Sequence, residues 1–204
     1  MGQRRHPEAG AESAPARFPE LVVLRDGSHV AIRLLEPEDG ALVQAVFDGM
    51  GEEMRYRRFL GFKSQLSAWD LELLTAVNHR GHEALAGLHA DSGQPLGIAR
   101  AIQEPGRPEI AEASVAVVDA WQGRGLGGIL LDRLVRRARE EGVRRFTVAL
   151  LTRNVAMLHL FERTGAVRIT GRYGDTLELA VELPFETGAP REALRAAAAG
   201  DVHE

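Results

Sequence analysis

The sequence predicts an α/β domain with a mixed, largely antiparallel central sheet and helices on both faces. In the first half of the chain, short apolar segments are separated by brief turns rich in Asp, Gly and Pro, which is typical of antiparallel strands. In the second half, strand-like and helix-like periodicities alternate, which indicates a right-handed parallel crossover. A glycine-rich segment, residues 121–128, joins the two patterns.

One folded domain is predicted, spanning residues 20–186. Residues 1–19 combine Gly, Ala, Pro and mixed charges without periodicity and predict a disordered leader, and residues 187–204 form an alanine-rich tail. The 204 residues carry a formal net charge of −4, so the composition favours no nucleic-acid partner. No apolar run approaches the roughly 20 residues of a membrane span. We therefore expect a cytoplasmic protein with no membrane partner.

The N-terminal elements are predicted from turn and cap residues. Asp26-Gly27 lies between two apolar runs and indicates a hairpin over residues 21–34. Ser67 followed by Asp70 fits a capping box at the start of a helix. The helices predicted in this half cover residues 36–47, 49–58 and 67–77.

Three strands joined by short turns follow, and they predict an antiparallel meander. Beyond the glycine-rich segment, Leu126 to Glu140 carries apolar residues on one face of a predicted helix. Asn154 is expected to cap another helix, which ends near Gly165. The predicted strands of this half cover residues 82–90, 96–103, 110–118, 145–151, 166–170 and 176–183.

The glycine-rich segment predicts an anion site. Its glycines lack the Cβ atoms that would keep a ligand from the backbone, and a helix begins within it. The first N–H groups of a helix have no partner inside the helix and lie at the positive end of its dipole. A phosphate group is the usual occupant of such a corner.

The glycines also allow three other interpretations. Gly123, Gly125 and Gly128 have the G-x-G-x-x-G spacing of a dinucleotide site, but the next strand ends at Thr152-Arg153 without the acidic residue such a site needs. A nucleoside-triphosphate loop is disfavoured because no Lys-Ser or Lys-Thr follows the glycines. A turn that only packs a helix close to a sheet is the third alternative.

Gln122-Gly123-Arg124-Gly125-Leu126-Gly127 matches the Q/R-x-x-G-x-G/A signature of the GNAT superfamily of acyl-CoA-dependent N-acyltransferases. The resemblance covers about residues 21–185 and implies the GNAT fold. The chain is also similar to the acetyltransferase domain of bacterial protein lysine acetyltransferases. The segments that carry this second similarity are Ile32-Arg33, Pro37-Glu38-Asp39, Arg58-Phe59, Ala111-Glu112-Ala113 and residues 121–127.

The resemblance implies acetyl-CoA as cosubstrate. By position, Val117 and Val118 would contact the pantetheine arm, and a backbone N–H near Val118 would polarise the thioester carbonyl. Asn154 would contact the thiol end of the arm or would only cap its helix. The pyrophosphate would be held by Gln122, Gly123, Arg124, Gly125, Leu126, Gly127 and Gly128.

Glu112 is the expected general base, because the resemblance places the catalytic glutamate of the protein-acetylating subgroup at this position. Strand alternation puts Glu112 on the same face as Ser114, where we expect it to be partly buried. The alternatives are a surface carboxylate or an ion-pair partner of Arg100. Phe161 stands where many family members carry a Tyr acid. His159 is a possible substitute acid, but a histidine between Leu158 and Leu160 on a helix is more often structural.

No metal site is expected, because the spacing of His79, His82 and His89 fits none. Arg55, Arg57 and Arg58 are expected to form a solvated helix end, although Arg58 could line the acceptor site. The expected acceptor-binding segments are the two N-terminal helices and the turn near Gly171.

The predicted function is transfer of an acetyl group from acetyl-CoA to a primary amine, with protein lysine as the favoured acceptor. Because the chain has no cysteine, direct attack in a ternary complex is favoured over a covalent relay. The alternatives are a small-molecule amine acceptor, such as an amino acid, polyamine or antibiotic, and a non-catalytic acyl-CoA-binding module. The sequence leaves a homodimer open.

Overall fold

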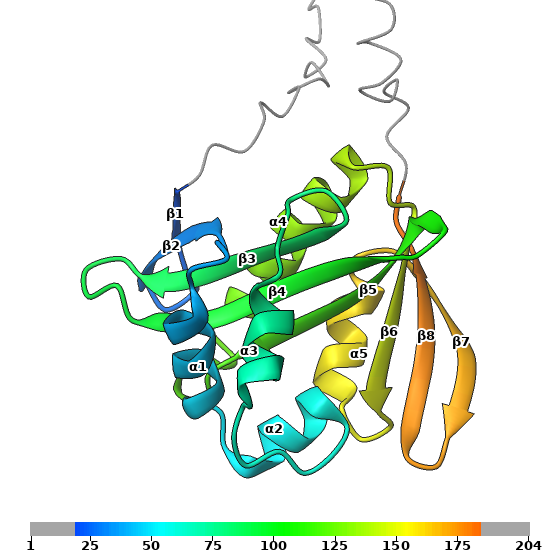
Figure 1. Ribbon diagram of the computed structural model, residues 1–204, viewed down its shortest axis with the longest axis horizontal. Coiled ribbons are helices and arrows are strands. Elements are labelled where there is room, and N and C mark those ends of the chain that lie inside the picture. The colour runs from blue at the N-terminus through cyan, green and yellow to red at the C-terminus, as the bar shows by residue number, and fades with distance from the viewer. Residues whose placement is uncertain (1–18, 185–204) are drawn as a thin grey trace, which may run out of the picture.

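The computed structural model describes residues 19–184. Nearly all of the predicted leader and the whole predicted alanine-rich tail lie outside these residues. The described chain forms one eight-stranded sheet with helices on both faces (Figure 1). The strands are β1 (Glu20–Val23), β2 (His29–Leu34), β3 (His82–His89), β4 (Pro95–Glu104), β5 (Arg107–Val117), β6 (Arg145–Leu151), β7 (Ala166–Tyr173) and β8 (Thr176–Glu182). The helices are α1 (Gly40–Asp48), α2 (Glu52–Phe59), α3 (Ala68–Thr75), α4 (Leu126–Glu140) and α5 (Val155–Glu162), with a short 3₁₀ turn η1 (Asp119–Trp121).

The first five strands form the predicted antiparallel meander, in the order of the chain. The β1–β2 hairpin turns at Asp26-Gly27, where the Gly27 N–H donates to the Leu24 carbonyl over 3.0 Å. The register of β4 and β5 runs without a bulge from Gly97–Val117 to Gln103–Ala111. Side chains therefore alternate regularly along this part of β5.

The two halves of the sheet meet over a short distance. β5 and β6 are parallel and pair only at Ile110–Arg145, Ala111–Phe146 and Glu112–Thr147. Beyond Glu112 the two strands diverge, and β6 continues in antiparallel pairing with β8 and then β7 (Figure 1). This divergence leaves one edge of β5 without a strand partner.

Each face of the sheet has its own apolar core. α4 and α5 cover one face, where Leu130, Leu134 and Phe161 are fully buried. α1 and α3 cover the other face with Val46 and Phe47 against Ile98. The predicted fold class is thereby confirmed. None of the described helices is long and apolar enough to cross a membrane.

Local signals placed most element ends to within one residue, but the first two helices begin at Gly40 and Glu52 rather than at residues 36 and 49. Ser67 and Asp70 form the predicted capping box, with Ser67 Oγ accepting from Asp70 N over 3.1 Å. The helix stops at Thr75 rather than Val77. β7 runs on to Tyr173, beyond the predicted end at residue 170, because the turn to β8 needs only Gly174-Asp175.

Candidate active site

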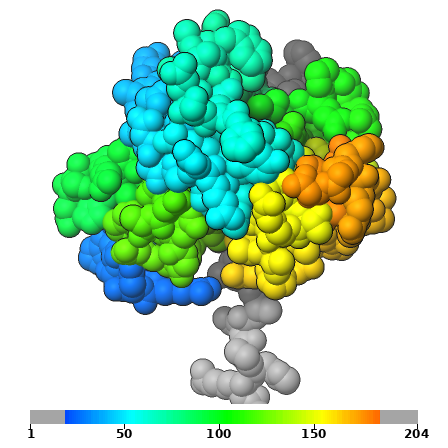
Figure 2. Space-filling view, turned by 90° about the horizontal axis from the view of Figure 1, so that it is seen from below, coloured from blue at the N-terminus to red at the C-terminus, as the bar shows by residue number. Residues whose placement is uncertain are grey.

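A groove of about 580 Å³ lies along β5 at Val115 and Val117, beyond the part of the strand that pairs with β6. It is bounded by the N-terminus of α4, by α5 and by α2, which meet on the face shown in Figure 2. Every predicted cofactor-binding residue except Val118 lines it. These residues are Val117, Gln122, Gly123, Arg124, Gly125, Leu126, Gly127, Gly128 and Asn154.

The glycine corner presents free backbone donors to this groove. Gly123 and Gly125 have φ angles of +74° and +99°, a conformation that side-chain-bearing residues rarely adopt. Gly125 caps α4 without any side-chain hydrogen bond. Within residues 19–184, the N–H groups from Gly123 to Gly127 make no hydrogen bond. The corner can therefore bind an anion with its backbone.

Two arginines near the corner differ in their readiness to bind a phosphate. The guanidinium of Arg124 is already engaged, since it donates to Asp26 over 3.0 Å and to the Ala120 carbonyl over 2.9 Å. The Arg25 side chain lines the groove and has no hydrogen bond or ion pair with another described residue. Arg25 Nε lies 3.6 Å from the position of a Cβ on Gly125. The sequence analysis did not identify Arg25, which reaches the corner from the β1–β2 turn.

Val118 does not occupy the predicted position in the groove. Its N–H donates to the Leu96 carbonyl over 2.9 Å, and its carbonyl accepts from Trp121 N. The expectation that an N–H near Val118 polarises the thioester is therefore wrong for Val118 itself. Because antiparallel hydrogen bonding alternates along a strand, the N–H and C=O of Val117 point away from β4, toward the open edge of β5.

The Gln122 side chain links the glycine corner to the end of β5. Its Nε2 donates to the Val117 carbonyl over 3.2 Å and to Asp119 Oδ1 over 3.0 Å. The Val117 N–H remains as the free donor on this edge. Val117, the residue next to Val118, therefore presents the free backbone N–H that was expected near Val118.

Asn154 is a helix cap that also faces the groove. It is 8% exposed, and its side chain accepts from Met157 N over 3.4 Å. The capping role is present in the structure, and the side chain lines the groove as well. The two roles that the sequence left open are compatible.

Glu112 lies where β5 and β6 begin to diverge, as the last β5 residue paired with β6. It shares the α1–α3 face of the sheet with Ser114, as alternation predicted. The expectation of partial burial is wrong, because Glu112 is exposed. No ion pair of the described residues joins it to Arg100. The nearby charge that interacts with it is Arg58 of α2.

The arginines of α2 are not a solvated helix end. Arg55 stacks on the Phe47 ring at 4.3 Å and donates to the Phe47 and Ser64 carbonyls. Arg57 lines the groove, and its Nε is buried without a partner. Arg58 is half-buried on the other side of the helix, against a second, smaller cavity. Helical periodicity alone places Arg57 and Arg58 on different sides of α2, but the sequence does not show that each side faces a cavity.

The candidate acids and metal ligands take structural or solvated positions. Phe161 is fully buried in the core beside α4, and His159 is exposed and lines neither cavity. His79 Nδ1 contacts the buried Glu83 carboxylate at 2.7 Å. The described residues contain no cluster of His, Asp and Glu that could hold a metal ion.

Comparison with known proteins identifies the family. Residues 44–166 match the model of the Acetyltransferase (GNAT) family. The chain belongs to this family. This family is one of acetyltransferases.

Individual GNAT proteins are similar to this one in sequence and structure. Acetyltransferase Pat of Mycolicibacterium smegmatis is 33% identical over 152 residues, which cover 73% of this chain and 44% of that protein. Acetyltransferase PA5475 of Pseudomonas aeruginosa is 31% identical over 141 residues, covering 67% and 74%. The solved GNAT domain of S. lividans PAT has a TM-score of 0.74 and 28% identity, covering 84% of this chain and 100% of that one. The chain thus spans less than half of the M. smegmatis relative.

Proposed function

We propose that this GNAT protein transfers an acetyl group from acetyl-CoA to the side chain of a protein lysine, with Glu112 as general base. The observation that carries the proposal is the position of Glu112 at the vertex where β5 and β6 diverge. The cofactor groove lies on the same open edge. The acceptor amine would reach this vertex from the α1–α3 face.

The groove residues fit coenzyme A by their chemistry. Free backbone N–H groups, a helix N-terminus and the unpaired Arg25 suit a pyrophosphate. The open edge of β5 offers the Val117 N–H to the thioester carbonyl. Bound in this way, acetyl-CoA supplies an activated acetyl group with a thiolate leaving group.

The base is needed because a free lysine amine has a pKa near ~10.4 and is mostly protonated at neutral pH. Glu112 accepts the amine proton, directly or through one water. The amine nitrogen then bonds to the acyl carbon and the carbon–sulfur bond breaks. Thiols have a pKa of about 8.5, so the leaving thiolate can take a proton from solvent without a tyrosine acid.

The acceptor is proposed to be a protein lysine because the chain resembles bacterial protein lysine acetyltransferases in several separate segments. The similarity to Acetyltransferase Pat is consistent with this proposed acceptor. We also propose a cytoplasmic location. A small amine remains the alternative acceptor, to be separated by assaying thiol release with lysine proteins and with free amines.

The test compares Glu112→Gln with a matched control, Glu109→Gln, an exposed carboxylate earlier on the same strand. Calorimetry should show coenzyme A binding in both variants and no comparable binding of NADP. Turnover at pH 7 should fall by about 10²–10⁴-fold in Glu112→Gln only, the usual contribution of a general base. Unchanged turnover in Glu112→Gln would overturn the base assignment. Coenzyme A binding without thiol release for any amine would instead favour a non-catalytic module.

A further inference from the structure

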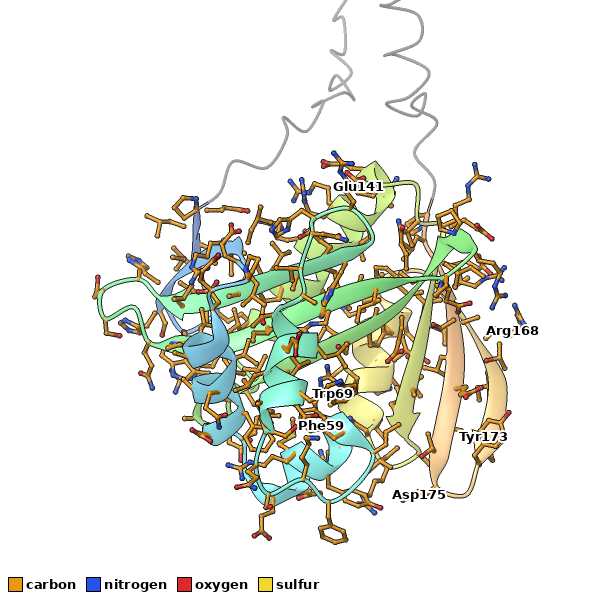
Figure 3. The ribbon with its side chains drawn as sticks, in the orientation of Figure 1. Phe59, Trp69, Glu141, Arg168, Tyr173 and Asp175 are labelled. Atoms are coloured by element: carbon orange, nitrogen blue, oxygen red, sulfur yellow. The ribbon has the colours of Figure 1, made fainter. Side chains whose placement is uncertain are left out.

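A second cavity lies on the α1–α3 face, two residues along β5 from Glu112. It offers about 30 Å³, enough for one small polar group rather than a whole substrate. Most of its lining is apolar, and half of the lining residues come from α1–α3, including Phe59, which Figure 3 labels at the end of α2. The polar groups that reach it are Arg58 of α2, Arg100 of β4 and Ser114 of β5.

Arg100 is buried in this lining without a partner. It is 4% exposed, and both its Nε and its Nη1 are buried with no hydrogen bond. Its neighbour across the sheet is Ser114. Burial, together with the nearby charge of Arg58, lowers the pKa of Arg100 to about 9. An unpaired buried guanidinium is costly, which indicates that a ligand completes the site.

The surroundings of Arg100 contain an excess of positive charge. Arg58 is half-buried beside it, and no hydrogen bond joins Arg58 to another described residue. The acid that acts on Arg58 is Glu112, whose carboxylate is exposed and outside the cavity lining. The cavity therefore lacks an anion to match its cations.

We propose that this cavity binds a carboxylate carried by the acceptor close to its reacting amine. The proposal rests on the proposed function, in that the chain must acetylate an amine. A guanidinium binds a carboxylate through two parallel hydrogen bonds, and Ser114 can donate a third. A carboxylate head matches the small volume of the cavity.

The geometry also limits the acceptor. Residues two apart on a strand are separated by about 6.6 Å, so the carboxylate at Ser114 lies that far along β5 from Glu112. An amine at Glu112 and a carboxylate at Ser114 are therefore roughly 6–7 Å apart in space. This spacing fits a short amino acid or a lysine residue beside an acidic residue. The acceptor class is thus an amine with a neighbouring carboxylate.

The binding step can be tested without any turnover. Sodium acetate, compared with sodium chloride at equal ionic strength, should raise the Tm of the wild-type protein by about 1–3 °C, because a ligand of the folded state stabilises it. Arg100→Met should lose this response, and Arg168→Met should keep it. Arg168 is an exposed arginine on β7, away from the cavity (Figure 3). Equal stabilisation by acetate and chloride, or an unchanged response in Arg100→Met, would overturn the proposal.

The acceptor step is tested with matched amines. One pair consists of lysine peptides with Glu or Gln beside the lysine, and the other of 4-aminobutanoate and its amide. The first pair tests a carboxylate carried by a peptide, and the second tests one carried by a small molecule. The carboxylate form should be favoured about tenfold or more in kcat/KM, the usual effect of a charge-assisted hydrogen bond. In Arg100→Met the preference should vanish through KM, with kcat changed much less. Equal use of both forms by the wild-type protein would overturn the proposal.

A structural role for Arg100 predicts different results. If Arg100 only supported the fold, Arg100→Met would lower Tm and kcat and leave the acceptor preference intact. Should that variant fail to fold, Arg58→Met on α2 provides the same comparison. A protein that responds to acetate but acetylates no amine would contradict the proposed function and leave the anion site standing.

Discussion

Gln122 Nε2 donates to the carbonyl oxygen of Val117 over 3.2 Å, which ties the glycine corner to the open edge of β5. The bond holds the corner and the exposed strand end in a fixed relation. It also occupies the Val117 carbonyl and leaves the neighbouring N–H free. The position of that N–H relative to the corner therefore depends on one side-chain amide.

Gln122→Leu should weaken coenzyme A binding by about three- to tenfold, because one hydrogen bond that orients the corner is lost. Calorimetry gives the Kd directly. Gln103→Leu is the matched control, since Gln103 donates to the Glu141 carbonyl far from the groove. Equal affinities in both variants would show that Gln122 does not orient the site.

Gly125→Ala should weaken both folding and coenzyme A binding. The φ of +99° costs a side-chain-bearing residue about 1 kcal/mol or more, and the new methyl group approaches Arg25. Gly142→Ala provides the control at the other end of α4. Its φ is +85° and a Cβ there meets nothing within 4 Å, so only stability should fall. A similar loss of coenzyme A affinity in both variants would contradict a binding role for the Gly125 corner.

Arg25→Met should reduce coenzyme A affinity more than Arg124→Met. Arg25 is unpaired toward the groove, whereas Arg124 already donates to Asp26 and Ala120. We expect a loss of about tenfold for Arg25→Met at low salt, and a smaller one at high salt because exposed charges are screened. Calorimetry at two salt concentrations measures both effects. The reverse order would assign the pyrophosphate contact to Arg124.

Stability should fall as the pH drops from about 6.5 toward 4. Burial and the charge of Arg100 lower the pKa of His82 to about 4, against 6.5 in an unfolded chain. In this range the unfolded state binds the extra proton, so acid favours unfolding. The free energy of unfolding should decrease by about 2 kcal/mol between pH 7.5 and pH 5, as measured by urea titration. His82→Gln should flatten this dependence, and an equally steep profile in that variant would exclude His82 as its source.

Glu83→Gln should lower the free energy of unfolding by about 2–3 kcal/mol, because it leaves the Arg137 guanidinium without its buried carboxylate. The double variant with Arg137→Met should lose less than the sum of the two single variants. Glu182→Gln is the control, since the Arg145–Glu182 pair is much more exposed and should contribute less than about 1 kcal/mol. Chemical denaturation of the wild-type protein, the two single variants and the double variant measures the coupling, and the same measurement is made on the control.

The sequence predicted those features that depend on neighbouring residues. Asp26-Gly27 and the Ser67 capping box are set by local hydrogen bonds, and the glycine corner by backbone conformation. The face of β5 that carries Glu112 followed from alternation alone. These parts of the fold and site were correct because no distant segment was needed to specify them.

The remaining features depend on distant segments. Whether Val117 or Val118 presents its N–H to the groove is fixed by the register with β4, which alternation of side chains does not reveal. Arg25 reaches the corner only because the first hairpin packs beside α4. The exposure of Glu112 and the closeness of the Arg58 and Arg100 charges depend on how the helices cover the sheet.

The two halves of the sheet, β1–β5 and β6–β8, are joined by only three residue pairs between β5 and β6. A pantetheine arm bound along the open edge of β5 would add contacts between these two halves of the sheet. Cofactor binding should then slow amide hydrogen exchange at Val115 and Val117 more than at residues of the central meander. The cosubstrate would thus stabilise the junction between the two halves of the sheet as well as take part in the reaction.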